Sequence, residues 1–267
     1  MFAALANPHR FMAFSRWAAP ILGVLAFCLI AIGLWTGLEA PPDYQQGYTV
    51  KIMFIHVPAA WMGMMGYSCL AGASFISLVF RHALADAAAK AVAPLGATFT
   101  AIALVTGSLW GRPMWGTWWV WGDARLMSML VLLLLFLGYM ALRSSIEDEA
   151  KAARAGEILA LIGIINLIVV KVSVDCFNTL HQAESVVRGS GQCPIPGLGS
   201  ASDAMMRESA AAGAAKTGSA LAPVYLHPLL TMGAGYATAF GALWLARIRA
   251  EVWRRRANSL ALRAALS

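Results

Sequence analysis

The sequence predicts an all-α membrane protein, a polytopic bundle of six transmembrane helices with a tryptophan-rich periplasmic loop. Of the 267 residues, 60% are hydrophobic and only 12% are charged, whereas soluble domains have roughly 25% charged residues. Six apolar runs approach or exceed the roughly 20 residues that a helix needs to cross about 30 Å of hydrocarbon. Basic residues also gather between alternate runs, as expected when a chain crosses a membrane repeatedly.

The six predicted spans share one chain without an internal repeat, so we expect a single membrane domain over residues 1–267. The spans are residues 20–38, 58–80, 92–109, 126–142, 158–174 and 223–246. Pro58 opens the second span, where a first helical turn tolerates proline. The fifth span carries an internal charge, Lys171, close enough to its end for the ammonium group to reach the interface.

The basic residues predict the orientation, because lysine and arginine accumulate in cytoplasmic loops. The segments on the N-terminal side hold Arg10, Arg16, Arg81, Lys90, Arg143, Lys151, Arg154, Arg247, Arg249, Arg254, Arg255, Arg256 and Arg263. The opposite segments hold Lys51, Arg112, Arg125, Arg188, Arg207 and Lys216. We therefore expect both termini in the cytoplasm of a bacterial cell, with the protein in the inner membrane. The net charge of +7 lies mostly beside the spans, which favours anionic lipid over nucleic acid as its partner.

The loop predicted between the third and fourth spans, residues 110–125, holds five of the ten tryptophans. They are Trp110, Trp115, Trp118, Trp119 and Trp121. One or two would be ordinary interfacial anchors. Five in one loop, with Gly111, Pro113 and Gly116 shaping the backbone, predict an aromatic platform. Its natural ligand is a large, planar, amphipathic molecule.

Two histidines are predicted on the same outer side as this loop. His56 lies at the mouth of the second span, and His181 follows the outer end of the fifth. Each alone is more typical of an interfacial hydrogen-bonding residue than of a metal ligand. Together they suit haem, whose iron takes imidazoles from opposite faces of the porphyrin, so we expect both to be axial ligands. His227, in the sixth span, is a weaker third candidate.

Two arginines border the loop. Arg112 and Arg125 can pair with haem propionates, because a guanidinium group binds a carboxylate well. They serve equally well as anchors at the membrane interface. Both roles stay open from the sequence.

The four cysteines give no thiolate metal site. Cys28 and Cys69 fall inside predicted spans, whereas Cys176 and Cys193 fall near the outer face, where a disulfide is possible but not decided. No CxxCH occurs, so we expect haem b bound without covalent attachment. Cys193 lies in a long outer segment, residues 178–222, that is rich in glycine, alanine and serine.

The loop sequence WGRPMWGTWWVWGDARL resembles the tryptophan-rich WWD motif of membrane proteins that handle haem in cytochrome c maturation. FIHVPAAWM, NTLHQ and the ending ALWLARIRAEVWRRR further resemble the haem exporter protein C family, CcmC. The resemblance runs from about residue 20 to residue 256. The motifs are highly specific in combination.

This resemblance implies six membrane helices, a periplasmic WWD loop and haem ligation by His56 and His181. By the same motif, the haem-binding surface comprises Trp115, Trp118, Trp119, Trp121, Asp123, Arg112 and Arg125. The implied partners are an ATPase subunit, a second membrane subunit, a small single-span subunit and a periplasmic haem chaperone. The implied role is to present haem at the periplasmic face and load it onto that chaperone.

Two features depart from the family pattern. The family usually reads WVWDARLT, whereas this chain reads WVWGDARLM, with Gly122 inserted and Met127 in place of threonine. Asp123 and Arg125 are thus shifted relative to the tryptophans. The segment after His181 is also longer than in the family, which bears on the surface that meets the chaperone.

These observations predict a haem-handling protein rather than an enzyme. No GxxxxGK[ST] motif occurs, so ATP hydrolysis is expected in a separate subunit. The main alternative is a bis-histidine membrane cytochrome for electron transfer, although such proteins usually place their ligands inside the spans. A small-solute transporter is less favoured, because transporters keep polar or broken helices near the midplane, and here only Asn166 and a few hydroxyls interrupt the spans.

Overall fold

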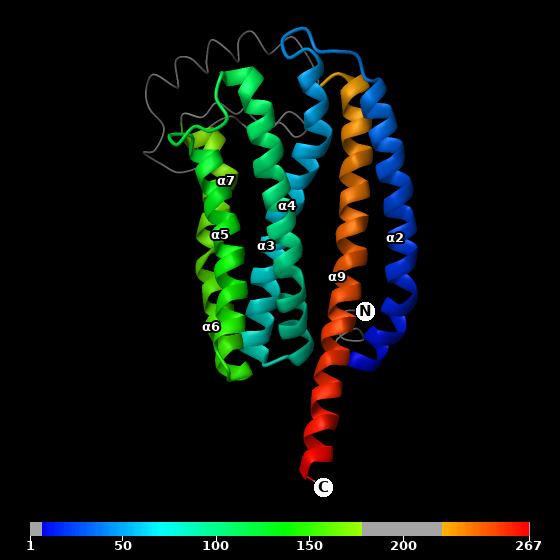
Figure 1. The fold of residues 1–267 in the computed structure, drawn as a ribbon, viewed down its shortest axis with the longest axis vertical. Helices are drawn as coiled ribbons and strands as arrows, with labels where there is room; N and C mark the ends of the chain where they lie inside the picture. The colour runs from blue at the N-terminus through cyan, green and yellow to red at the C-terminus, as the bar shows by residue number, and fades with distance from the viewer. Residues whose placement is uncertain (1–6, 178–220, 267) are drawn as a thin grey trace.

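The computed structural model describes residues 7–177 and 221–266 as a bundle of long helices (Figure 1). Along the chain these are α2 (Pro8–Glu39), η1 (Tyr48–Ile52), α3 (Met53–Phe80), α4 (Ala83–Trp115), α5 (Ala124–Ser145), α6 (Glu149–Ile162), α7 (Ile164–Cys176) and α9 (Pro223–Leu266). Six helical stretches, with η1–α3 and α6–α7 each counted as one, are long and apolar enough to cross a membrane. The predicted all-α bundle with six spans is confirmed.

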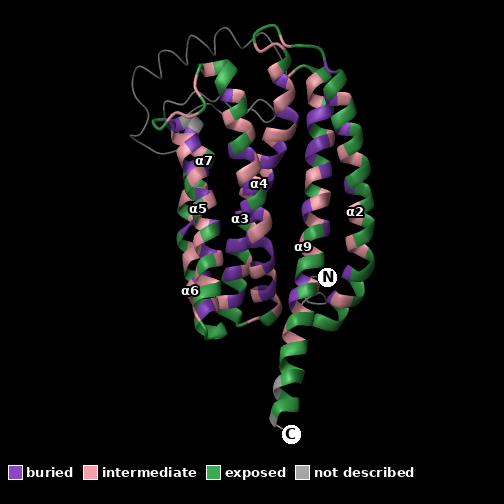
Figure 2. Ribbon diagram, viewed as in Figure 1, coloured by how far each residue is buried: buried purple, intermediate pink, exposed green. Residues whose placement is uncertain are grey.

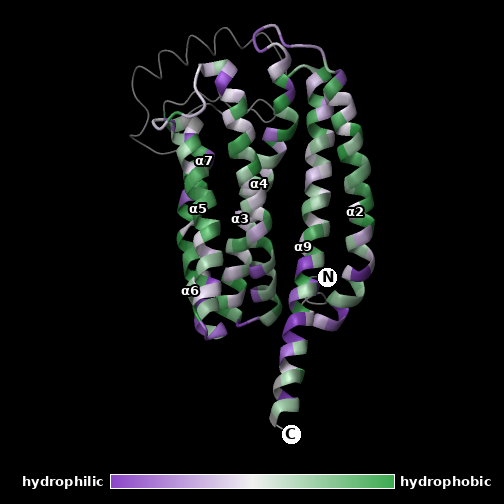
Figure 3. Cartoon of the chain, viewed as in Figure 1, coloured by the Kyte–Doolittle hydropathy of each residue, from purple (hydrophilic) through white to green (hydrophobic). Residues whose placement is uncertain are grey.

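The helix ends and connections gather at two opposite ends of the bundle (Figure 1), and hydrophilic residues occur at both (Figure 3). We call one the loop end. It holds the start of α3, the connection from α4 to α5 and the end of α7. The other, which we call the charged end, holds the start of α2, the turns from α3 to α4 and from α5 to α6, and the last turns of α9.

Close contacts between small residues bring α3, α4 and α5 together. A Cβ atom added to Gly66 of α3 would lie 2.9 Å from the Cα of Gly96 in α4, and one added to Gly96 would lie 2.1 Å from the Phe136 ring of α5. Glycine therefore lets these helices approach closely. The rings of Phe136 and Tyr67 meet edge to face at 5.1 Å. Both are fully buried, and the buried positions in Figure 2 concentrate on α3 and α4.

Helix α2 lies along α9 (Figure 1). A Cβ atom on Gly33 of α2 would come within 2.7 Å of the Met232 side chain of α9. The other face of α2 exposes large apolar side chains, including Phe14, Trp17, Ile21, Val24, Phe27, Ile32, Trp35 and Leu38. In a membrane, that face can meet lipid.

The fifth span is broken at Gly163, between α6 and α7. A Cβ atom at Gly163 would lie 1.8 Å from the Tyr67 hydroxyl oxygen, so only glycine fits beside this side chain. Directly after the break, the Asn166 amide donates a hydrogen bond to the Ser128 carbonyl of α5 at 3.0 Å. The two helices together form one apolar stretch, Glu149–Ser173, that is long enough to cross a membrane, as the sequence predicted for residues 158–174.

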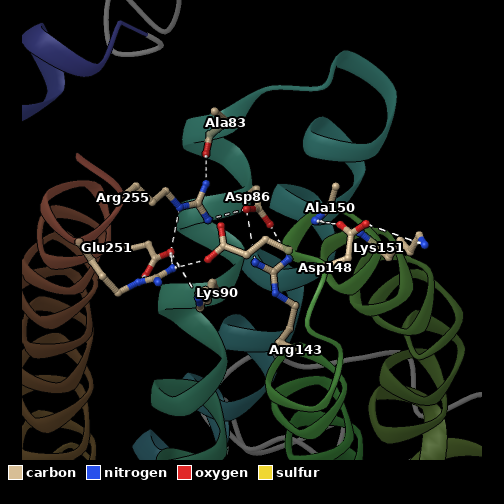
Figure 4. A network of polar contacts seen from close by, with 11 residues as sticks. Ala83, Asp86, Lys90, Arg143, Asp148, Ala150, Lys151, Glu251 and Arg255 are labelled. Carbon is tan, nitrogen blue, oxygen red and sulfur yellow. Dashed lines mark hydrogen bonds and ion pairs between the residues drawn. The ribbon is translucent and has the colours of Figure 1, made fainter. Parts of the chain in front are cut away.

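A network of ion pairs joins α4, α5 and α9 at the charged end (Figure 4). Asp86 of α4 binds Arg143 of α5 at 2.7 Å and also contacts Arg255 of α9. Glu251 of α9 binds Arg255 at 2.8 Å and Lys90 of α4 at 3.4 Å. These ion pairs connect the three helices where they leave the apolar part of the bundle.

Helix α6 begins in the same region with an aspartate cap. The Asp148 carboxylate accepts hydrogen bonds from the backbone N–H groups of Ala150 at 2.9 Å and Lys151 at 3.1 Å. The bonds from Lys151 and Ala150 hold the pKa of this carboxyl group below its usual range. An ionised carboxylate at the first turn also interacts favourably with the helix dipole.

Candidate functional site

His56 lies in the first turn of α3, at the loop end, and its ring packs against α4. Its Nδ1 is 2.9 Å from the carbonyl oxygen of Ala103 and 3.2 Å from the hydroxyl oxygen of Thr106. The Trp110 ring meets the imidazole edge to face, with 5.7 Å between centroids. The side chain is half-buried, so α4 fixes the ring while the site stays near the end of the bundle.

Trp110 belongs to this histidine site rather than to the loop. We predicted a loop over residues 110–125, but α4 continues to Trp115 and ends at Gly116, which adopts a left-handed conformation with φ of 75°. The Gly116 N–H donates to the Arg112 carbonyl and closes the helix. The Trp110 indole N–H donates to the Gln46 side chain at 3.1 Å.

The sequence analysis did not single out the α4 residues around His56. Ala103, Thr106, Gly107 and Trp110 recur at the three- and four-residue spacing of one helix face. This spacing indicates a shared face, but it does not reveal that the face meets His56.

The remaining loop tryptophans fall into exposed and packed positions. Trp118 is 51% exposed and Trp121 is 74% exposed. Trp119 packs against the main apolar core, and its ring meets that of Trp121 edge to face at 5.8 Å. Trp115 is half-buried. Its ring packs against Gly111, where an added Cβ atom would lie 2.9 Å from the ring.

Arg112 lies beside the exposed part of the loop. The central carbon of its guanidinium group is 5.7 Å from the centroid of the Trp118 ring. This arrangement sets a cation over the face of an aromatic ring. An apolar surface is thereby placed next to a positive charge.

Asp123 caps the N-terminus of α5. Its carboxylate accepts a hydrogen bond from the Leu126 N–H at 2.8 Å, and the residue is only 2% exposed. Gly122 precedes this cap, and a Cβ atom added there would have no neighbouring atom within 4 Å. Arg125 lies in the first turn of α5 and is half-buried.

His181 and Cys193 lie outside the described residues, as do all other predictions for 178–220. The described chain reaches Phe177, at the same end of the bundle as His56 and the loop (Figure 1). Cys176 is disulfide-bonded, whereas Cys28 and Cys69 are free. The weaker candidate His227 is exposed on α9 and lines a shallow hollow with Glu39 of α2.

Comparison with known proteins places the chain in a family. The family model described as heme exporter protein C matches residues 1–196. The chain belongs to the heme exporter protein C family. A family member from Bradyrhizobium diazoefficiens is 48% identical over 96% of this chain and 87% of its own length. One from Paracoccus denitrificans is 39% identical over 97% of this chain and 96% of its own length.

The family likeness extends to a mitochondrial protein of Marchantia polymorpha. Its name describes it as ccmC-like and assigns it to cytochrome c biosynthesis. It is 41% identical over 70% of this chain and 79% of its own length. The family predicted from the loop and histidine motifs is therefore confirmed.

Proposed function

We propose that this chain binds haem b non-covalently at the loop end of the bundle and presents it to a periplasmic haem chaperone. One observation carries the proposal, the 2.9 Å contact between His56 Nδ1 and the Ala103 carbonyl. A carbonyl oxygen only accepts hydrogen bonds, so Nδ1 carries the proton, and Nε2 is the unprotonated nitrogen of the neutral ring. Histidines that ligate metals are commonly oriented in this way.

The loop surface also fits haem. The exposed rings of Trp118 and Trp121 offer flat apolar area for a porphyrin, and Arg112 offers a positive charge for a propionate. Trp115, Trp119 and Arg125 complete the proposed surface, with Asp123 holding the loop against α5. His181 is proposed as the second axial ligand on the strength of the family motif. When bound, haem supplies the vinyl groups that a chaperone captures.

The names of the relatives describe an exporter component, and we propose the same assembly here. The partners are an ATPase subunit, a second membrane subunit, a small single-span subunit and the chaperone. ATP hydrolysis belongs to the ATPase subunit, so this chain binds and transfers haem without being an enzyme. The loop end faces the periplasm, and the charged end faces the cytoplasm of a bacterial inner membrane.

The absorption spectrum of the protein, purified from cells that lack the chaperone, tests this proposal. His56→Ala and His181→Ala should each lower the haem content, because each removes one axial ligand. His9→Ala is the control, since His9 is an exposed histidine in the first turn of α2, away from the loop end. Haem content equal to the parent in the first two variants would remove the axial assignment. Reversible oxidation and reduction by quinol would instead support an electron-transfer cytochrome.

A further inference from the structure

We propose that Thr106 of α4 is a positioning residue that holds the His56 imidazole in the orientation needed to bind iron. The inference rests on the proposed role of His56 as an axial ligand. The hydroxyl oxygen of Thr106 lies 3.2 Å from His56 Nδ1, beside the shorter contact to the Ala103 carbonyl. The Nδ1–H group is therefore shared between two acceptors on one turn of α4.

The hydroxyl of Thr106 is oriented to accept this bond. It donates its own hydrogen to the Ile102 carbonyl at 2.6 Å, the usual back-bond of a helical threonine. Its oxygen then presents a lone pair toward His56. Such a bond raises the basicity of the imidazole and fixes its direction, and residues with this role commonly change metal affinity by about 10–100-fold.

The neighbouring residues restrict the same ring by shape. A Cβ atom on Gly107 would lie 2.9 Å from Cε1 and 3.3 Å from Nδ1 of His56. Trp110 contacts the ring edge to face, and its indole is held by Gln46. One face of α4 thus determines both the hydrogen bonding and the plane of the imidazole. A histidine that only anchored the chain at the interface would not need this enclosure.

The test compares Thr106→Val, which keeps the shape and loses the acceptor, with Thr106→Ser, which keeps the acceptor. We expect Thr106→Val to bind haem about tenfold more weakly, at the low end of the usual range because the Ala103 carbonyl remains. Its haem midpoint potential should rise, because a less basic imidazole stabilises ferric iron less. Thr106→Ser should match the parent in both measurements, and His56→Ala should lose haem.

A measurement without haem separates this proposal from the proposed function. In protein with ¹⁵N-labelled histidine, the His56 signal, assigned by its loss in His56→Ala, should report a proton on Nδ1 in the parent and should shift in Thr106→Val, which removes one of the two acceptors. Gly107→Ala should displace the ring and weaken haem binding even if Thr106→Val folds poorly. Parental affinity and potential in folded Thr106→Val, with haem lost from His56→Ala, would overturn the positioning role alone. Parental haem content in His56→Ala would overturn both proposals.

Discussion

At the scale of single residues, the tryptophans between residues 110 and 121 differ in what they contact. Trp110 packs on His56, and Trp119 packs on the apolar core. Trp118 and Trp121 are instead 51% and 74% exposed. A planar ligand can gain stacking area only from rings that are accessible, so the binding energy should come mainly from the exposed pair.

We predict that Trp118→Ala combined with Trp121→Ala weakens haem binding by more than tenfold, about 1.4 kcal/mol or more, because two exposed aromatic faces are lost. The protein should still insert into the membrane and show a parental unfolding temperature. The control is Trp253→Ala, which removes an exposed tryptophan from the charged end of α9. The haem-to-protein absorbance ratio measures occupancy, and an unchanged ratio in the double variant would refute the platform.

The structural role of Asp123 could not be predicted from the sequence. The WWD motif placed it in the haem-binding surface, and the structure uses its carboxylate to cap α5. Both roles suit an acidic residue before an apolar run, because aspartate is among the best N-cap residues. The motif identifies the residue, but only the folded structure shows which backbone N–H group donates to it. In contrast, the sequence placed His56 at the mouth of the second span, and the residue lies in the first turn of α3, although its partners on α4 were not identified.

At the scale of helices, Gly163 between α6 and α7 packs closely against Tyr67 of α3. We predict that Gly163→Ala destabilises the protein by about 1–3 kcal/mol, because its Cβ would overlap the Tyr67 hydroxyl in a packed interior. Tyr67→Phe removes that hydroxyl, which has no hydrogen-bond partner among the described residues. Tyr67→Phe alone should therefore cost little, and it should recover part of the stability of Gly163→Ala.

Thermal unfolding of the parent, the two single variants and the double variant gives the coupling between these positions. Additive effects would mean that the hydroxyl is not what excludes a side chain at residue 163. The sequence could not predict this contact, because residues 158–174 are apolar on both sides of the glycine. The steric partner comes from α3, which is far away in the chain.

The ion pairs at the charged end yield a second prediction about helices. Asp86→Asn should destabilise the protein by about 3 kcal/mol, because it leaves Arg143, whose side chain is only 6% exposed, without its carboxylate partner. Glu149→Gln is the control. Glu149 also binds an arginine, Arg254, but it is 67% exposed, so its loss should cost at most about 1 kcal/mol. Equal unfolding temperatures for the two variants would show that burial of the Asp86 pair does not matter.

At the scale of the whole molecule, the helix α9 extends past its neighbours at the charged end (Figure 1). Its 44 residues span about 66 Å, roughly twice the thickness of the hydrocarbon core. The hydropathy pattern predicted only residues 223–246 of α9, because the apolar run that predicts a membrane span ends where the arginines begin. The number of spans and the fold class were predictable, since both depend on apolar length. The extent of helix outside the membrane was not.

The distribution of basic residues predicts the direction in which the bundle crosses the membrane. The charged end carries Arg254, Arg255 and Arg256 on α9, and lysine and arginine favour the cytoplasmic side. We therefore expect a cysteine introduced as Gly122→Cys, at the loop end, to react in intact cells with a maleimide that cannot cross the inner membrane. Arg263→Cys, at the charged end, should react only after lysis. Both positions are exposed, so accessibility within the protein is matched. Labelling of Arg263→Cys alone in intact cells would reverse the orientation and place the histidine and loop site in the cytoplasm, where a periplasmic chaperone cannot reach it.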